Sequence, residues 1–254
     1  MFRLLDHGPC PPAWNMAVDC ALWRSHAENG GPPTIRFYQW VQPTLSVGAG
    51  QKLPPDLTKE RLEALGWAFV RRPSGGRAVL HGGDLTYSVV AGQREGFPPS
   101  VRAVYRRLCR GLQAGLAQLG ITASTGTPSR NSRKEFHCFA WISDGDLSFQ
   151  GKKFAGGAQV WRSDTFLQHG SIMVDPPAAN WQQFQTLPDL NQPFPPNTTC
   201  LSEILERPVS ISSLKTALQQ GLREELNITL MPGDLTTWEE DQLRLELEAI
   251  TQQF

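Results

Sequence analysis

Cysteine and lysine side chains are the groups in this chain of 254 residues best suited to covalent chemistry. The cysteine count is odd, the spacings are wide and no Cys-x-x-Cys pair occurs, so the sequence indicates neither a zinc site nor a disulfide framework. A lone cysteine is most often a small buried apolar residue, which suits Cys20 and Cys109 on apolar helix faces and Cys10 and Cys200 in loops. Cys138 could act as a nucleophile if a nearby cation favoured its thiolate, because a free thiol has a pKa of about 8.5.

The run Arg71-Arg72-Pro73-Ser74-Gly75-Gly76-Arg77 is the densest candidate for binding an anion or a carbonyl group. Glycines let backbone N–H groups approach a ligand closely, and arginines bind carboxylates and phosphates. The run has neither the spacing of a P-loop nor that of a dinucleotide-binding turn. By itself it is typical of an ordinary turn with solvated arginines, just as Lys153, beside Lys152, is typical of a solvated lysine at a strand end.

Alternating strands and helices must position these groups. The apolar spacing predicts helices over 13–27, 57–65, 101–119, 212–226 and 238–251. Strand-like runs fall at 34–38, 45–48, 67–70, 85–90, 139–142, 147–150, 153–160 and 165–174, and residues 176–200 suit a loop. This order predicts one mixed α/β domain with a small helical C-terminal piece.

Charge and hydropathy exclude several classes of protein. The formal net charge is zero, so the chain as a whole is not an electrostatic nucleic-acid binder. No segment approaches the roughly 18 apolar residues of a membrane span, and the N-terminus does not read as a signal peptide. Together with the cysteine pattern this predicts a cytoplasmic protein in a reducing compartment.

Four stretches resemble the signature segments of the lipoate- and biotin-protein ligase superfamily, in the order that the family has them. They are Asn15-Met16-Ala17-Val18-Asp19, Arg36-Phe37-Tyr38-Gln39-Trp40 with Pro43-Thr44-Leu45-Ser46-Val47-Gly48, Arg71 to His81, and Gly151-Lys152-Lys153-Phe154-Ala155-Gly156. The resemblance implies a central mixed β-sheet flanked by helices, as in class II synthetase catalytic domains. We expect a catalytic domain over residues 1–200 and a helical extension over residues 201–254 packed on it.

Within this superfamily the sequence is most similar to the LipM-type octanoyltransferases, which use a cysteine and no ATP. Cys138 and Phe139 match the step that carries their nucleophile, fifteen positions before Lys153. Gly76-Arg77 and the stretches Asp84 to Ser88, Ala155 to Gln159 and Leu167 to Ile172 also resemble that subfamily. Gly157 is a departure, because a serine or similar small residue is expected there.

The resemblance implies that Cys138 accepts the acyl group and that Lys153 favours its thiolate and binds the acyl carbonyl. Substrate-binding roles are implied for Arg72, Ser74, Gly75, Gly76, Arg77, Ala78, His81, Tyr87, Gly156, Ala158 and His169. Phe37, Trp40 and Val79 are further candidates for an apolar tunnel, each equally suited to the plain core. No cofactor and no metal are implied.

The implied partners are octanoyl acyl carrier protein as donor and a lipoyl domain or the glycine-cleavage H protein as acceptor, with neither nucleic acid nor membrane. Arg102, Arg106, Arg107 and Arg110 could form a docking face for the carrier, or a merely solvated helix face. Three alternatives stay open: an ATP-dependent lipoate-protein ligase, a cysteine-dependent octanoyl or lipoyl amidotransferase, and an acyl-binding protein without activity.

Overall fold

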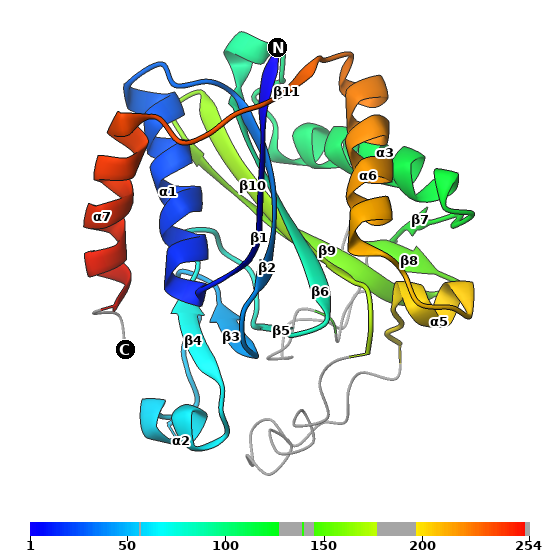
Figure 1. The fold of residues 1–254 in the computed structure, drawn as a ribbon, viewed down its shortest axis with the longest axis horizontal. Helices are drawn as coiled ribbons and strands as arrows, with labels where there is room; N and C mark the ends of the chain where they lie inside the picture. The colour runs from blue at the N-terminus through cyan, green and yellow to red at the C-terminus, as the bar shows by residue number, and fades with distance from the viewer. Residues whose placement is uncertain (56, 127–138, 140–144, 177–196, 252–254) are drawn as a thin grey trace.

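A computed structural model describes residues 1–55, 57–126, 139, 145–176 and 197–251 (Figure 1). Cys138 lies outside the described residues, as do most of the run 139–142 and most of the segment 176–200, for which a strand and a loop were predicted. No helix in the described part of the chain is long and apolar enough to cross a membrane.

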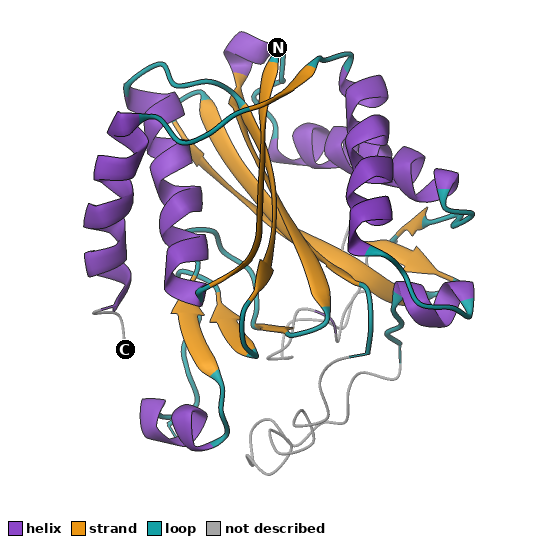
Figure 2. Cartoon of the chain, viewed as in Figure 1, coloured by secondary structure: helices purple, strands orange, loops and turns teal. Residues whose placement is uncertain are grey.

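A mixed sheet runs through the centre of the molecule (Figure 2). Its strand order is β11-β1-β2-β6-β10-β9-β8-β7. β1 pairs in parallel with β11 and with β2, and the pairs from β2 to β7 are antiparallel. The strands are β1 (Phe2–Cys10), β2 (Thr34–Trp40), β6 (Asp84–Gly92), β7 (Ser124–Thr125), β8 (Leu147–Phe149), β9 (Lys152–Arg162), β10 (Thr165–Met173) and β11 (Leu230–Pro232).

A second, smaller sheet carries the loop that follows Arg71. Its order is β4-β3-β5, with β3 (Thr44–Val47) parallel to β4 (Ala68–Arg71) and antiparallel to β5 (Val79–His81). The short helix α2 (Lys59–Ala64) precedes β4, and Thr58 caps its first turn. Apolar side chains of α2 and of the small sheet form a separate hydrophobic cluster with Trp67.

Helices cover both faces of the large sheet. α1 (Pro12–Glu28) and α7 (Thr237–Thr251) lie together on one side, and α3 (Val101–Gln118) and α6 (Ile211–Leu226) lie on the other (Figure 1). Side chains of β10 point alternately to the two faces of the large sheet. Phe166 and Ile172 enter the core beneath α3 and α6, whereas Leu167 packs with α1. The elements η1 (Gln93–Glu95) and α5 (Leu201–Leu205) complete the chain.

Three glycines let α3 and α6 cross with their backbones in contact. A Cβ atom at Gly221 would lie 2.2 Å from the backbone nitrogen of Gly115 and 2.3 Å from the carbonyl oxygen of Gly111. At Gly115 it would lie 2.5 Å from the carbonyl oxygen of Ala217. Any side chain at these positions would force the two helices apart.

The structure confirms the predicted mixed α/β class with helices on a central sheet. In the described part of the chain it contains six elements that the sequence did not predict: β1, β5, η1, β7, β11 and α5. Cys10 was predicted in a loop but ends β1. β11, within the segment 201–254, pairs with β1, so this segment contributes a strand as well as helices. The domain boundary at residue 200 stays a prediction.

Candidate active site

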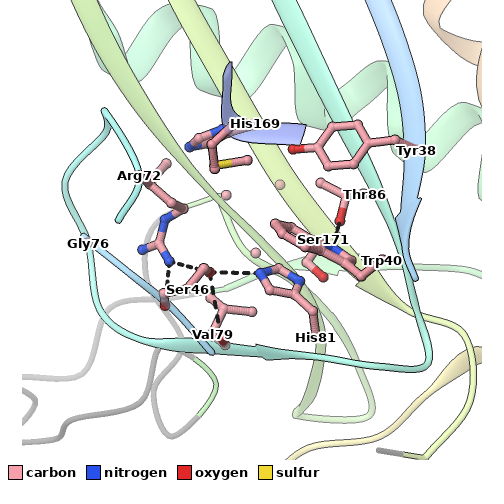
Figure 3. A pocket seen from close by; sticks show the side chains of 15 residues that line it. Tyr38, Trp40, Ser46, Arg72, Gly76, Val79, His81, Thr86, His169 and Ser171 are labelled. Carbon is pink, nitrogen blue, oxygen red and sulfur yellow. Dashed lines mark hydrogen bonds between the residues drawn. The ribbon is translucent and has the colours of Figure 1, made fainter. Parts of the chain in front are cut away.

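A pocket is lined by residues of α1, the large sheet and the small sheet. Figure 3 shows the side chains that line it. The pocket holds about 440 Å³ of empty space including its mouth. The lining is predominantly apolar surface with a few polar side chains, as is usual for a small-molecule site. It consists of Met16, Tyr38, Trp40, Ser46, Arg72, Gly76, Val79, His81, Thr86, Gly156, Gly157, Ala158, His169, Gly170 and Ser171.

A hydrogen-bonded array that centres on His81 forms one polar wall. His81 Nδ1 lies 2.8 Å from Asp84 Oδ2 and His81 Nε2 lies 2.7 Å from Ser46 Oγ. The carboxylate can only accept, so the Nδ1 atom carries a proton. The indole of Trp40 stacks on His81 at 4.0 Å, and Trp40 Nε1 donates to Thr86 Oγ1 at 2.8 Å. The imidazole is therefore fixed in both its plane and its tautomer.

Asp84 anchors that array at the base of β6. Burial by itself would raise the pKa of the Asp84 carboxyl, but the His81 ring and hydrogen bonds from Ser171 and the Gly82 N–H outweigh it. The resulting pKa lies below the usual range, so the group is an anion at neutral pH. The Thr86 hydroxyl also donates to Asp84, at 3.1 Å.

A second array of the same kind holds the loop that follows Arg71. His169 Nδ1 lies 3.2 Å from Asp19 Oδ2, and His169 Nε2 lies 2.5 Å from Ser74 Oγ. Burial lowers the pKa of His169, and the neighbouring Asp19 only partly offsets this effect. The neutral ring therefore donates from Nδ1 to Asp19 and accepts the Ser74 hydroxyl proton at Nε2. Ser74 is fully buried and ties its loop to β10.

Asp19 joins α1 to three strands of the sheet. It accepts hydrogen bonds from Arg36 Nη1 at 2.7 Å, Ser88 Oγ at 2.8 Å and Tyr38 OH at 3.0 Å, in addition to His169. Burial would raise the pKa of the carboxyl, but the Arg36 guanidinium and the hydrogen bonds from His169 and Ser88 lower it overall. The Asp19–Arg36 pair is completely buried, so each charge depends on the other.

The Arg72 side chain shapes the loop by hydrogen bonds to backbone carbonyl groups of other residues. Its Nη1 atom donates to the carbonyl oxygen of Ser46 at 2.8 Å and to Ser46 Oγ at 2.7 Å. Its Nη2 atom donates to the carbonyl oxygen of Arg77 at 2.7 Å. Gly76 adopts φ +93°, a conformation that favours glycine. The guanidinium lines the pocket while it holds the turn closed over it.

Lys153 lies behind the pocket wall rather than in solvent. Its Nζ atom donates to Asp146 Oδ2 at 2.7 Å, and both side chains are only 1% exposed. The Nζ atom also lies 5.1 Å from the ring centroid of Phe139. Ser148 pairs with Lys153 and Leu147 with Ala155, so β9 has one extra residue between them. Such a bulge redirects neighbouring side chains.

The structure brings together six of the predicted substrate-binding residues in the pocket lining: Arg72, Gly76, His81, Gly156, Ala158 and His169. Trp40 and Val79, two of the tunnel candidates, also line it. Other predicted residues do not: Ser74, Ala78, Tyr87 and Phe37 are buried in the protein interior, Gly75 is exposed, and Arg77 is half-buried.

The sequence reasoning missed the polar side chains that orient the site, namely Asp19, Ser46, Asp84, Asp146 and Ser171. A signal was present in α1, where Asn15 and Asp19 occur among apolar residues and are both fully buried. Cys20, which was predicted on the apolar face of this helix, is only half-buried. Polar residues four positions apart on the buried face of a helix indicate a buried hydrogen-bond network.

The arginines of α3 divide into two groups. Arg107 donates to the carbonyl oxygens of Gly96 and Leu226 and lies over the Phe97 ring, so it has a structural role. Arg102, Arg106 and Arg110 are exposed, and Arg110 pairs with Glu225 at 2.6 Å. The docking face stays a prediction.

The chain combines a mixed sheet, a glycine-rich loop over an apolar pocket and a buried lysine at the pocket wall. A model of the lipoyl protein ligase A/B catalytic domain matches residues 11–223, and the chain belongs to this family. Octanoyltransferase LipM of Symbiobacterium thermophilum is 38% identical over 98% of this chain and 94% of its own. Octanoyltransferase LipM of Bacillus subtilis is 34% identical over 94% of this chain and 91% of its own.

Solved structures share the fold at lower identity. A lipoate-protein ligase A bound with ATP superposes with a TM-score of 0.78, at 24% identity over 97% of this chain and 94% of that chain. A bi-partite lipoate protein ligase from Thermoplasma acidophilum gives a TM-score of 0.74, at 23% identity over 97% of this chain and 91% of that chain. The family match and the curated relatives confirm the predicted superfamily, and these solved structures show the same fold.

Proposed function

We propose that this chain is an octanoyltransferase of lipoate biosynthesis. It moves an octanoyl group from an acyl carrier protein thioester to a lysine of a lipoyl domain or of the glycine-cleavage H protein, through a thioester on Cys138. The observation that carries the proposal is the buried ammonium of Lys153 at the pocket wall, 5.1 Å from the ring of Phe139. Phe139 is the residue bonded to Cys138 in the chain.

In the first step the Cys138 sulfur attacks the carbonyl carbon of the carrier thioester. The new C–S bond forms as the bond to the carrier sulfur breaks, and the proton of the Cys138 thiol goes to the departing carrier thiolate. The Lys153 ammonium supplies the cation that favours the thiolate and a donor for the developing oxyanion. Its burial strengthens both interactions relative to those of a solvated lysine.

In the second step the neutral amine of the acceptor lysine attacks the acyl-Cys138 carbonyl. The C–N bond forms, the C–S bond breaks, and one amine proton returns to the Cys138 sulfur. Both steps exchange bonds of similar or increasing stability, so the sequence consumes no ATP. The supporting sequence evidence is the identity of 34–38% to octanoyltransferases, against 23–24% to the ligase structures described above.

The pocket suits an aliphatic chain. Met16, Trp40, Val79 and Ala158 offer apolar surface, while His81 and Ser46 lie together at one wall. Burial of a methylene group contributes about 0.8 kcal/mol, so an octanoyl tail supplies several kcal/mol of binding. The arrays around His81 and His169 keep the polar groups satisfied without a ligand, which limits the reorganisation needed when the acyl chain enters.

Intact-protein mass spectrometry tests the proposal. The enzyme is mixed with octanoyl carrier protein without ATP, and a lipoyl domain is then added. The expected result is an octanoyl adduct on the wild type that the lipoyl domain discharges and that Cys138→Ala abolishes. Cys200→Ala is the matched control, because Cys200 packs in the same cluster as Phe139, and burial raises the pKa of its thiol.

The alternatives give different results. Modification of the lipoyl domain that needs ATP and survives Cys138→Ala would identify a lipoate-protein ligase and contradict the proposal. Acyl transfer from an octanoylated H protein, but not from the carrier protein, would identify an amidotransferase. No transfer from any donor would identify an acyl-binding protein. A thiol nucleophile suits a reducing compartment, and we propose a cytoplasmic location on that ground.

A further inference from the structure

The buried carboxylate of Asp146 belongs to the candidate site through Lys153. The Lys153 Nζ to Asp146 Oδ2 distance is 2.7 Å, and each side chain is 1% exposed. An ammonium in such a place requires a compensating anion, because transfer of an isolated charge from water into the protein interior is costly. Asp146 supplies that anion and, with it, a fixed direction for the Nζ–H bonds.

Both members of the pair are held by their backbones. The Lys153 N–H donates to the carbonyl oxygen of Asn197 at 2.7 Å, and its carbonyl oxygen accepts from the Thr199 N–H at 3.0 Å. The Asp146 carbonyl oxygen accepts from the Gly126 N–H at 2.9 Å. Two chain segments that are distant in sequence, one at Gly126 and one at residues 197–199, therefore fix the two ends of one ion pair.

Helix α3 supports the residue before Asp146. Gly145 adopts φ +107°, and a Cβ atom there would lie 2.4 Å from the ring of Tyr105. The Cys109 thiol donates to the Gly145 carbonyl oxygen at 2.9 Å, and the Tyr105 hydroxyl donates to the carbonyl oxygen of Gly157 at 3.1 Å. Tyr105 thus connects the turn that carries Asp146 to a strand that lines the pocket.

The pair abuts the pocket wall at Gly156. A Cβ atom there would lie 2.9 Å from Lys153 Cε and 3.0 Å from both Lys153 Nζ and Asp146 Oδ1. Gly156 itself lines the pocket. Gly156 therefore contacts both the ion pair and the pocket, so a small displacement of Nζ would change its distance to a carbonyl group bound there.

We propose that Asp146 is a positioning residue for acyl transfer, which holds the Lys153 ammonium charged and aimed at the pocket wall beside Phe139. This inference rests on the proposed function, in which Lys153 assists Cys138. Asp146 does not touch the substrate in this scheme. Its contribution passes entirely through Lys153, and a double-mutant cycle can isolate that dependence.

The experiment is single-turnover acylation from octanoyl carrier protein, with rates corrected for the folded fraction. Asp146→Asn should lower the acylation rate at saturating donor by about 10- to 100-fold, since a displacement near 1 Å can cost 100-fold. The donor concentration at half-saturation should change by less than about twofold, because the pocket itself is unchanged. In a Lys153→Met background the same substitution should change the rate by less than about twofold.

Two further variants separate positioning from stability. Asp146→Glu keeps the charge but lengthens the side chain, so it should fold and still lower the acylation rate about tenfold or more. Glu239→Gln is the matched control. It removes a buried carboxylate that pairs with Arg3 at 2.7 Å, outside the pocket lining, and it should lower the melting temperature without changing the acylation rate of folded enzyme.

An Asp146→Asn enzyme that acylates at the wild-type rate would overturn the inference. So would a loss of the same size with and without Lys153, which would show that Asp146 acts independently. Both results leave the proposed function intact, since the wild type would still form the Cys138 adduct. Absence of that adduct in the wild type would instead refute the proposed function and the inference together.

Discussion

Asp19→Asn should destabilise the protein strongly, although it changes one oxygen to a nitrogen. The substitution keeps the shape of the side chain but removes the charge that balances Arg36, and both groups are completely buried. The new amide nitrogen would also face groups that themselves donate: Arg36 and Ser88 in one orientation of the amide, Tyr38 and His169 in the other. Every hydrogen-bond partner of Asp19 is itself buried.

Loss of one partner of a buried ion pair costs about 3–5 kcal/mol in free energy of unfolding. For a chain of this length each kcal/mol lowers the melting temperature by about 2–4 °C, so the expected decrease is roughly 6–20 °C. Urea denaturation would measure the free energy directly, and an unchanged m value would show that the variant and the wild type unfold between comparable states.

Glu28→Gln is the control for this measurement. Glu28 pairs with Arg162 at 2.6 Å, but the two side chains are 39% and 48% exposed. Such a surface pair contributes about 0–1 kcal/mol, so the control should stay close to the wild type. If Asp19→Asn were also within about 1 kcal/mol of the wild type at the same m value, the buried array would not stabilise the fold as argued.

Three other changes give distinct expectations. Burial and the adjacent Arg36 lower the pKa of His7 from 6.5 to about 4, and His7 Nδ1 accepts from Arg36 Nε at 2.9 Å. The unfolded chain therefore binds a proton first as the pH falls, so stability should be lost between pH 6.5 and 4. The loss should be on the order of 1 kcal/mol, because solvent screens the partly exposed ring, and His7→Asn should reduce it in pH-dependent urea titrations. Gly221→Ala should lower stability by about 1–3 kcal/mol, despite the better helix propensity of alanine, because the new methyl group enters the contact of α3 with α6; thermal unfolding at or above the wild-type midpoint would contradict this. Val79→Phe should fill part of the pocket and raise the preference for hexanoyl over octanoyl donors about tenfold, the equivalent of two buried methylene groups, and an unchanged ratio of kcat/KM values would exclude Val79 from the acyl path.

Local patterns predicted most of the regular elements, because their periodicity matches their burial. α3 has an apolar stripe at helical spacing, Ser100 caps its N-terminus, and Gly120 with φ +86° ends it. β1 escaped prediction because its pattern is irregular. Gly8 has φ +57° and the pairing with β2 shifts register between Asp6 and Pro9, so no clean alternation marks this strand.

The polar frame of the site was less predictable because its partners are distant in sequence. Asp19 is buried only because Arg36, Ser88 and His169 surround it, and no local window contains all four residues. Lys153 looked like a solvated lysine beside Lys152, yet Asp146 and the ring of Phe139 enclose it. The family motif identified Lys153 as important, and only the fold reveals what holds its charge in the interior.

The coupling of Asp19 to its partners also constrains how this site can evolve. Loss of Asp19 during evolution would leave the buried Arg36 guanidinium without its counter-ion, so the two positions should change together or not at all. The apolar lining has no such dependence, and residues such as Val79 and Met16 can vary one at a time. The preferred length of the acyl chain should therefore vary readily among related sequences, whereas Asp19 and Arg36 should be retained together.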